Sequence, residues 1–393
     1  MRGAPRIFIF LMAEATSLHF FIFRRTVFVG SSVWSVVMTT PLLRELRRNI
    51  PHAWITLVVK PDICNLVQLC PYVDEVLIWE RLVSGRMAQL RRRVQALVFA
   101  WKHLWRHRFD VAIVPRSDVD YYDAAFLAYF SGATVRLGYS EKAHGYRKEP
   151  CRGLDRLHSH LMRGISPKHE VERGLDMLRI MNGVVMNDRL ELWLDESDLR
   201  LADEVLLSHA VRPDQLLIGV APGAGAPRRA WPVQRYAELA AWLCEEHDAC
   251  ILAVGGKGEE RLGRHLVETL GDRTIDVIGQ TTLRQTAALL KRCHFFVGND
   301  TGPMHLAAAM GVPIVEISCH PGSGSPVHPN SPLRFGPWEV PCVVVQPERP
   351  RRPCSEGCGA GSEPHCILEI GIKEAQNAIL EILVKCRLSE DVG

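Results

Sequence analysis

Residues 295–305 have the sequence FFVGNDTGPMH, which predicts a buried strand, a polar turn and the start of a helix. At such a turn the backbone N–H groups of Thr301 and Gly302 would point out of the helix start. Phosphate binds there because the N–H donors are unpaired and the helix dipole is positive. Gly302 allows close approach to the backbone, and His305 lies one turn further on. In a plainer interpretation, Asp300 only caps the helix and His305 packs in the core.

Strands and helices are expected to alternate on both sides of this stretch. The expected strands are residues 26–29, 54–59, 73–78 and 111–114 in the first half, and 216–221, 251–254, 295–297 and 313–317 in the second. The expected helices of the second half are residues 233–246, 259–270, 282–291, 305–310 and 372–385. This alternation predicts an α/β fold with parallel sheets and helices on both faces.

The chain is long enough for two domains. Its 393 residues exceed one ordinary domain, and 47% apolar and 23% charged residues are typical of a globular protein. A charged, weakly patterned stretch at 187–198 indicates domains at 27–190 and 191–393. The net charge of +3 gives no reason to expect nucleic-acid binding. Residues 1–26 are interpreted as a leading strand or divergent extension of a cytosolic protein, in preference to a signal peptide or membrane anchor.

A basic segment lies between residues 81 and 109, where eight Lys or Arg residues occur without an acidic one. Apolar residues recur in it at helical spacing: Val94, Leu97, Val98, Trp101, Leu104 and Trp105. One interpretation is a basic amphipathic helix that lies on an anionic membrane face. We favour the other, a helix packed on its sheet with a solvated basic side.

Two further glycine turns follow expected strands. Residues 221–225 are Ala-Pro-Gly-Ala-Gly, and Arg229 lies shortly after them, where it would reach a diphosphate. Residues 255–258 are Gly-Gly-Lys-Gly. Glycine turns at the carboxyl ends of parallel strands are typical of a nucleotide site, although each alone is equally consistent with ordinary loop geometry. Gly223-x-Gly225 is a weak dinucleotide motif, because the third glycine and the acidic residue of that fingerprint are missing.

The cysteines cluster only in the tail, as Cys354, Cys358 and Cys366 with His365 beside the last. This set is one thiolate short of a four-ligand zinc site unless His365 or Cys342 joins it. A structural metal and a disulfide are both considered. We favour plain thiols in an ordered tail.

The order and spacing of short strings along the chain resemble glycosyltransferase family 9, whose best-known members are the ADP-heptose:lipopolysaccharide heptosyltransferases. The matching strings are residues 35–47, 51–59, 73–76, 131–133, 136–139, 169–173, 222–224, 229–232 and 299–302 with His305. Each string is weak alone, but together they cover roughly residues 27–385 in the family's order.

The resemblance implies a GT-B fold, in which two Rossmann-like domains face a cleft. The N-terminal domain would bind the acceptor and the C-terminal domain an ADP-sugar. Family members invert the anomeric centre and need no catalytic metal, so we expect no metal or cofactor in the reaction. Carried over by position, the donor site comprises Gly223, Arg229, Asp300, Thr301, Gly302 and His305. A leaving nucleoside diphosphate needs cations and N–H donors, which these residues supply.

The catalytic base that the resemblance leads us to expect is missing. Family members carry Gly-Asp just before the stretch that begins here at Val36, but this chain has Trp34-Ser35. A serine cannot accept a proton near pH 7 as a carboxylate does. Losing a positioned base slows a reaction by about 10²- to 10⁴-fold.

Three explanations of Ser35 are open. Another carboxylate serves as the base, and Asp118, Asp120 and Asp123 are the candidates because they follow the strand that ends at 114. Alternatively, the protein binds nucleotide with weak or lost catalysis. The third explanation, which we favour slightly, is that the first 35 residues come from a wrong start or a shifted reading frame.

Three functions are therefore considered, in order of preference. The first is a cytoplasmic glycosyltransferase at the inner face of a bacterial membrane. It would move heptose, or a similar sugar, from an ADP-sugar to a lipopolysaccharide core or related lipid-linked saccharide. The second is a non-catalytic or regulatory GT-B protein that still binds nucleotide, in which Ser35→Asp would create or raise activity. The third is a Rossmann oxidoreductase, motivated only by Gly223-x-Gly225.

Overall fold

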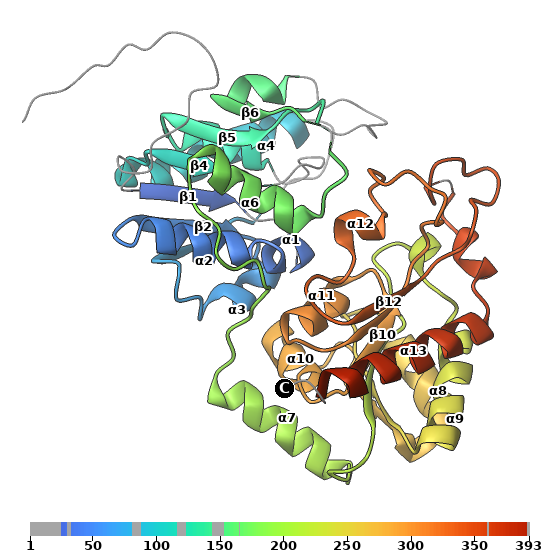
Figure 1. The fold of residues 1–393 in the computed structure, drawn as a ribbon. Helices are drawn as coiled ribbons and strands as arrows, with labels where there is room; N and C mark the ends of the chain where they lie inside the picture. Colours follow the sequence, from blue (N-terminus) through green and yellow to red (C-terminus); the bar gives the residue numbers. More distant parts are fainter. Residues whose placement is uncertain are drawn as a thin grey trace, which may run out of the picture.

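The protein is represented by a computed structural model. It describes residues 25–29, 33–80, 88–115, 123–143, 153–164, 166–359 and 361–390. Within these ranges, the strands form two separate six-stranded sheets, one in each half of the chain. Figure 1 shows the two halves side by side, each with helices packed around its own sheet.

The first sheet has the strand order β3-β2-β1-β4-β5-β6, and all of its pairings are parallel. Its strands are β1 (Arg25–Val29), β2 (Trp54–Val59), β3 (Glu75–Ile78), β4 (Val111–Ile113), β5 (Val135–Tyr139) and β6 (His160–Met162). The α-helices of this half are α1 (Val33–Val37), α2 (Thr40–Asn49), α3 (Cys64–Val67), α4 (Ala88–Phe99), α5 (Ala124–Phe130) and α6 (Glu170–Ile180).

The second sheet repeats the same connectivity, because its order is β12-β11-β10-β7-β8-β9 and its pairings are also parallel. Its strands are β7 (Leu217–Ala221), β8 (Cys250–Ala253), β9 (Thr274–Asp276), β10 (Phe295–Asn299), β11 (Ile314–Ile317) and β12 (Cys342–Val345). The α-helices are α7 (Glu196–Ser208), α8 (Val233–His247), α9 (Glu260–Leu270), α10 (Leu283–Leu290), α11 (Gly302–Ala309), α12 (Pro332–Phe335) and α13 (Ile372–Glu390).

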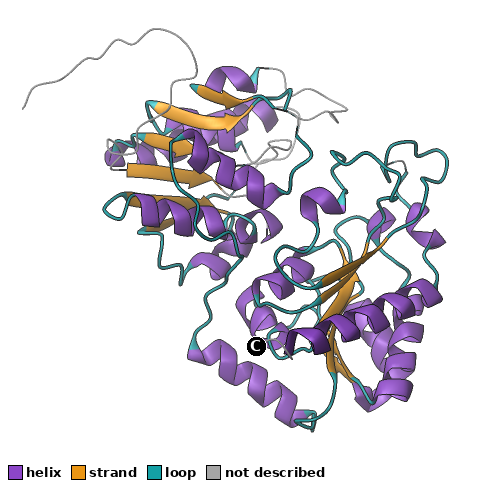
Figure 2. Ribbon diagram, viewed as in Figure 1, coloured by secondary structure: helices purple, strands orange, loops and turns teal. Residues whose placement is uncertain are grey.

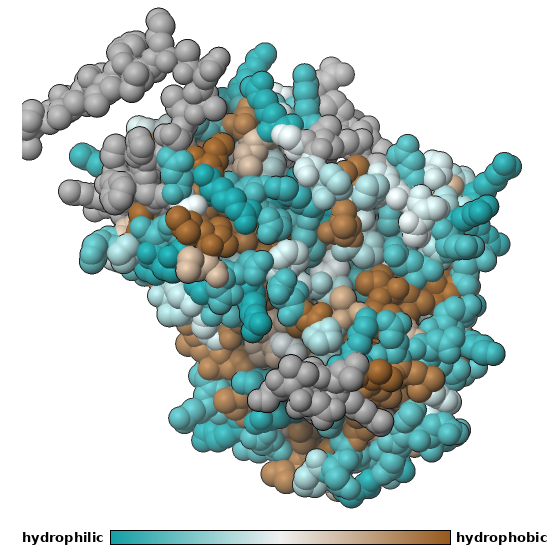
Figure 3. Space-filling model, in the orientation of Figure 1, coloured by the Kyte–Doolittle hydropathy of each residue, from teal (hydrophilic) through white to brown (hydrophobic). Residues whose placement is uncertain are grey.

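Both halves therefore have the doubly wound order of a Rossmann-like sheet, and the predicted α/β fold of GT-B type is confirmed. The central strands of the second sheet are buried on both faces, as expected when helices cover both sides (Figure 2). On the face drawn in Figure 3, apolar side chains form separate patches among hydrophilic ones. The domain boundary near residue 190 stays a prediction, and residues 1–24 lie outside the described part of the chain.

Several expected elements have different limits in the structure, among them one strand of the first half and the helix after residue 299. The strand expected from residue 73 begins at Glu75; Asp74, just before it, donates its backbone N–H to the Ile55 carbonyl at 2.9 Å and accepts the Ile55 N–H with its carboxylate at 2.7 Å. The helix expected from His305 begins three residues earlier, at Gly302, with Pro303 in its first turn. Proline is favoured there because it lacks the N–H that the helix start leaves unpaired.

The basic segment packs on its own half of the protein, but only some of its apolar residues take part in this packing. Ala96, Ala100 and Leu104 are buried, whereas Trp101 and Trp105 are 60% and 47% exposed. The packing face is thus made of small residues and one leucine, and the apolar stripe that contains the tryptophans faces outward. Residues 81–87 of this segment lie outside the described ranges.

The two halves contact each other through helices near their facing sides. Helix α1 contacts α11, and α3 contacts α10. A buried ion pair reinforces the contact: both Nε and Nη2 of Arg334 in α12 lie within 2.9 Å of Glu170 Oε1 at the start of α6. Arg334 is fully buried, so this charge depends on its partner for solvation.

Replacing Glu170 with alanine should strongly destabilise the joined halves. The substitution leaves the Arg334 guanidinium buried without its carboxylate, which lowers the free energy of unfolding by about 3–5 kcal/mol. Urea unfolding followed by tryptophan fluorescence measures the change. The matched control is Glu172→Ala in the same helix, because its pair with Arg179 is exposed and should contribute at most about 1 kcal/mol. Equal losses from the two variants would contradict this account of the interface.

Candidate functional site

The candidate site lies where the strand order of the second sheet reverses. Strands β7 and β10 are neighbours there, and Ala221 at the end of β7 pairs with Gly298 near the end of β10. The helices that follow these two strands leave in opposite directions from such a point, which opens space at the carboxyl ends of the strands. The two motifs singled out in the sequence, after residues 221 and 299, therefore meet at one edge of the sheet.

The side chain of Asn299 links the two motifs by hydrogen bonds, a role that the sequence analysis did not predict. Its Oδ1 accepts the Trp231 backbone N–H at 3.1 Å. Its Nδ2 donates to the carbonyl oxygens of Pro222 at 3.2 Å and Gly223 at 2.9 Å. The side chain is fully buried, so these bonds are shielded from water and fix the path of the loop between residues 222 and 231.

Helix α11 begins at the predicted position for phosphate binding, but Asp300 does not cap it. The N-cap residue is Thr301, whose side chain makes no capping hydrogen bond and instead donates to the Asn299 carbonyl at 3.3 Å. The side chains of the first turn thus leave its N–H groups to other acceptors. The interpretation of Asp300 as a simple cap is wrong.

Asp300 instead links the two basic residues of the predicted site. Its Oδ2 lies 3.8 Å from Arg229 Nη1, and its Oδ1 lies 3.5 Å from His305 Nε2. Arg229 comes from the short helical turn Pro227–Arg229, and His305 is buried in α11. The structure therefore brings Arg229, Asp300 and His305 together at the start of α11, beside the loop that carries Gly223.

Glu259 was missed in the sequence but occupies the space between the glycine turns. Its Oε2 accepts the Gly256 backbone N–H at 2.8 Å. A β-carbon on Gly223 would lie 2.1 Å from Glu259 Oε1, and one on Gly255 would lie 2.8 Å from Oε2. A side chain at either turn would therefore displace the Glu259 carboxylate from its present position. A carboxylate at this place in a Rossmann-like sheet has the chemistry to accept hydrogen bonds from ribose hydroxyls.

A buried carboxylate lies beside the candidate site. Glu316 in β11 is fully buried, and burial raises the pKa of its carboxyl group well above the ordinary value. The negative charge of Asp300 raises this pKa further, and a contact with Ser318 lowers it. A neutral Glu316 avoids a second negative charge beside the place where a diphosphate would bind.

His169 joins the first half to the rim of this site. Its Nε2 donates to the Gly336 carbonyl at 3.0 Å, while its Nδ1 accepts the Val171 N–H at 3.2 Å. Its ring stacks on Trp338 with centroids 4.5 Å apart. Burial lowers the pKa of His169 from 6.5 to about 4, and the Gly336 bond only partly offsets this effect.

Acid should therefore loosen the His169 contact. Because the pKa of His169 is lowered on folding, the unfolded chain binds its proton first as the pH falls. The stability from neutral His169 is complete above pH 6.5 and declines by about 3 kcal/mol as the pH falls to 4. Urea unfolding of wild type and His169→Gln across this range measures the difference. Parallel pH profiles in the two proteins would contradict the assignment.

The residues proposed as the base are only partly described. Ser35 lies in α1, which contacts α11, so its helix adjoins the candidate site. Its backbone carbonyl accepts the Thr39 hydroxyl at 2.5 Å. Asp118 and Asp120 lie outside the described residues, but β4, which precedes them, pairs with β1 where the order of the first sheet reverses. Asp123 begins α5.

Two Rossmann-like units, with a helix that begins at the switch point of the second sheet, are the architecture of a GT-B transferase. The sequence model of "Glycosyltransferase family 9 (heptosyltransferase)" matches residues 98–357, which is more than half of the chain. The chain belongs to this family, and it is a glycosyltransferase. Family membership favours this function over the oxidoreductase.

Several proteins that this chain resembles over most of its length are also heptosyltransferases. The chain is 27% identical to lipooligosaccharide heptosyltransferase 2 of Haemophilus ducreyi, over 81% of this chain and 87% of the relative. It is 28% identical to lipopolysaccharide heptosyltransferase 2 of Salmonella typhimurium, over 74% and 81%. The structure of E. coli ADP-heptose lps heptosyltransferase II has the same fold, with a TM-score of 0.65, 22% identity and coverage of 92% and 99%. A binding protein without catalysis is not favoured.

Proposed function

We propose that this glycosyltransferase moves heptose from ADP-heptose to the core saccharide of lipopolysaccharide, with inversion at the anomeric carbon. The observation that carries the proposal is the convergence of Arg229, Asp300 and the start of α11 at the switch point of the second sheet. The names of the two bacterial relatives support the sugar and the acceptor. The reaction would take place on the cytoplasmic side of the inner membrane.

The site residues would act on the leaving diphosphate. As the acceptor hydroxyl attacks the anomeric carbon, negative charge develops on the phosphate oxygen that leaves with ADP. The N–H groups of Thr301 and Gly302 and the Arg229 guanidinium would stabilise this charge. Asp300 would hold Arg229 and His305 in place through its two oxygens. Glu259 would accept hydrogen bonds from the ribose.

The proton of the acceptor hydroxyl needs a base other than Ser35. We propose Asp118 or Asp120 for this role, because both follow β4 at the reversal point of the first sheet. A carboxylate contributed from this sheet would act on the acceptor, while the second sheet binds the donor. This division would place the base and the leaving group on different units of the GT-B fold.

A thermal-shift series with ADP, UDP, GDP, CMP, NAD and ADP-heptose tests the donor assignment. A ligand at 100 times its dissociation constant adds about 2.7 kcal/mol of stability, which is readily detected. We expect ADP and ADP-heptose to raise the melting temperature and the other ligands to have little effect. Stabilisation by NAD alone, or by no nucleotide, would contradict the proposal.

We also propose that α4 and the turns after it contact the membrane that carries the acceptor. None of the helices in the described part of the chain combines the length and apolarity needed to cross a membrane. One face of this segment nevertheless exposes apolar side chains: Leu90, Val94, Leu97, Val98, Trp101 and Trp105. Arg91 and Lys102 are exposed among them. Tryptophan beside cationic residues fits the interface of an anionic bilayer.

Flotation with phosphatidylglycerol-containing vesicles tests this contact. Trp101→Glu should reduce the bound fraction several-fold, because it places a negative charge on the apolar face. The matched control is Leu207→Glu in α7, where a leucine is 76% exposed on a different surface. The same loss in both variants, or no binding of the wild-type chain, would contradict the proposal.

A further inference from the structure

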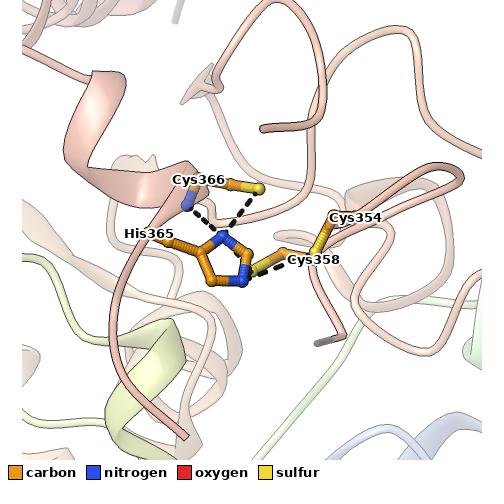
Figure 4. A group of neighbouring side chains, drawn as sticks. All are labelled: Cys354, Cys358, His365 and Cys366. Carbon is orange, nitrogen blue, oxygen red and sulfur yellow. Dashed lines mark hydrogen bonds between the residues drawn. The ribbon is translucent and has the colours of Figure 1, made fainter. Parts of the chain in front are cut away.

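We propose that Cys354, Cys358, His365 and Cys366 bind one transition-metal ion, with Zn²⁺ expected. These four residues, here called the cysteine cluster, lie in the connection between β12 and α13 (Figure 4). One ligand atom from each lies within 4.8 Å of the others. The assignment is separate from the proposed transfer reaction, which uses no metal.

The distances within the cysteine cluster fit a tetrahedral ion. With metal–sulfur bonds of about 2.3 Å and a metal–nitrogen bond of about 2.0 Å, each nitrogen–sulfur edge of the tetrahedron is about 3.5 Å. The ion would bind one ring nitrogen of His365. Nδ1 already accepts the Cys366 backbone N–H at 2.6 Å, which leaves Nε2 as the ligand atom. Nε2 lies 3.4 Å from Cys354 Sγ and 4.0 Å from Cys358 Sγ, on both sides of the required edge, whereas Cys366 Sγ lies 3.1 Å from Nδ1 and would have to turn toward the ion.

The backbone around the cysteine cluster favours thiolates. The Gly359 N–H donates to Cys354 Sγ at 3.4 Å, and the Arg351 N–H donates to Cys366 Sγ at the same distance. Such N–H donors stabilise and orient metal-bound sulfur. Three thiolates and one imidazole are the donors that Zn²⁺ prefers in a closed structural site.

The location gives the ion a structural role. Between the end of β12 at Val345 and the short helical turn Cys366–Glu369, the described residues contain no strand or helix. A connection of this length in a compact domain needs a special source of order. Cys358 and Cys366 are nevertheless fully buried. An ion that joins Cys354 and Cys358 in the middle of the connection to His365 and Cys366 at its end would supply that order, because metal binding contributes directly to folding.

The cysteine cluster also supports the loop that carries Arg229. Ile370, four residues after Cys366, accepts the Trp231 indole N–H at 2.9 Å. Arg235 donates to the carbonyl oxygens of Leu368 and Ile370. Trp231 is in turn bonded to Asn299 through its backbone N–H. The ion would therefore stabilise the loop that carries Arg229 through these hydrogen bonds, without contacting the donor itself.

Metal analysis of the full, tag-free chain tests the site directly. Mass spectrometry for zinc and iron should find about one ion per chain, as expected for a closed four-ligand site. Cys358→Ser and His365→Ala should each lose most of it, whereas Cys244→Ser, outside the cysteine cluster, should keep it. About one iron in place of zinc would uphold the site and correct the ion. No stoichiometric metal, or metal retained in both cluster variants, would overturn the proposal.

A measurement on the wild-type chain covers the case in which the cluster variants fail to fold. Titration with a mercurial thiol reagent should release zinc, detected with a metallochromic dye, as the cluster thiolates react. The melting temperature should fall in step with the release. A chain reconstituted with Co²⁺ should show the thiolate-to-cobalt bands of a tetrahedral site. Thiols that react without releasing metal, and Co²⁺ without these bands, would overturn the proposal.

Discussion

Replacing Arg229 with alanine should weaken ADP binding by about 10- to 100-fold, because charge-assisted hydrogen bonds to phosphate contribute roughly 1.5–3 kcal/mol. The same change should lower kcat/KM by about 10²- to 10³-fold, because the lost cation also stabilises charge that develops in the transition state. Calorimetric titration with ADP and steady-state kinetics measure the two effects. This variant is expected to have one of the two largest effects on activity.

Arg228→Ala is the matched control for Arg229. The two arginines are neighbours in the same turn, but the ion pair with Asp300 belongs to Arg229. Arg228→Ala should therefore leave ADP affinity within about twofold of wild type, as for surface substitutions generally. Equal losses in the two variants would mean that the turn contributes only diffuse positive charge. An unchanged affinity in Arg229→Ala would place the diphosphate elsewhere.

Replacing the proposed base should have an equally large effect, but on kcat and not on the affinity for ADP. Asp118→Asn or Asp120→Asn should lower kcat by about 10²- to 10⁴-fold, the usual contribution of a positioned general base. Affinity for ADP should not change, because the donor residues lie on the second sheet. Single-turnover transfer together with ADP titration separates the two quantities.

Ser35→Asp extends this test. In the Asn variant that has lost activity, a new carboxylate at position 35 should restore part of the rate, because α1 contacts α11 beside the donor site. If neither Asn variant loses activity, Asp118 and Asp120 are excluded as the base. If Ser35→Asp raises the activity of the otherwise unchanged chain by a similar factor, the chain lacks an efficient base of its own.

The strand-turn-helix motifs made the fold predictable, together with the clustering of the residues proposed as the donor site. The turns at 300–302 and 222–229 each follow a strongly apolar strand, and parallel strands bring their carboxyl ends to one edge. The motif residues Arg229, Asp300 and His305 could therefore be placed together before their contacts were known. Turn and helix-start signals are local in sequence, so they can be recognised without knowing what packs against them.

The features that were missed depend on contacts between distant segments. Glu259, which directly follows the turn at 255–258 and precedes α9, becomes part of the site because folding brings it against Gly223 in the turn after β7. The pair between Glu170 and Arg334 joins residues 164 positions apart. The interpretation of the cysteine cluster as plain thiols stays a prediction; folding adds the proximity of Cys354 and Cys358 to the adjacent residues His365 and Cys366, on which the metal proposal rests. The outward face of α4 likewise depends on which side of the helix its own half covers.

The most direct test of the central claim is transfer itself. The purified chain is incubated with ADP-heptose and lipopolysaccharide from a strain that lacks core heptose, and ADP release and acceptor mass are followed together. The account predicts one ADP released for each heptose added to the acceptor, with release greatly reduced in Arg229→Ala. Transfer from a UDP- or GDP-sugar but not from ADP-heptose, or ADP release that is the same in Arg229→Ala, would contradict it.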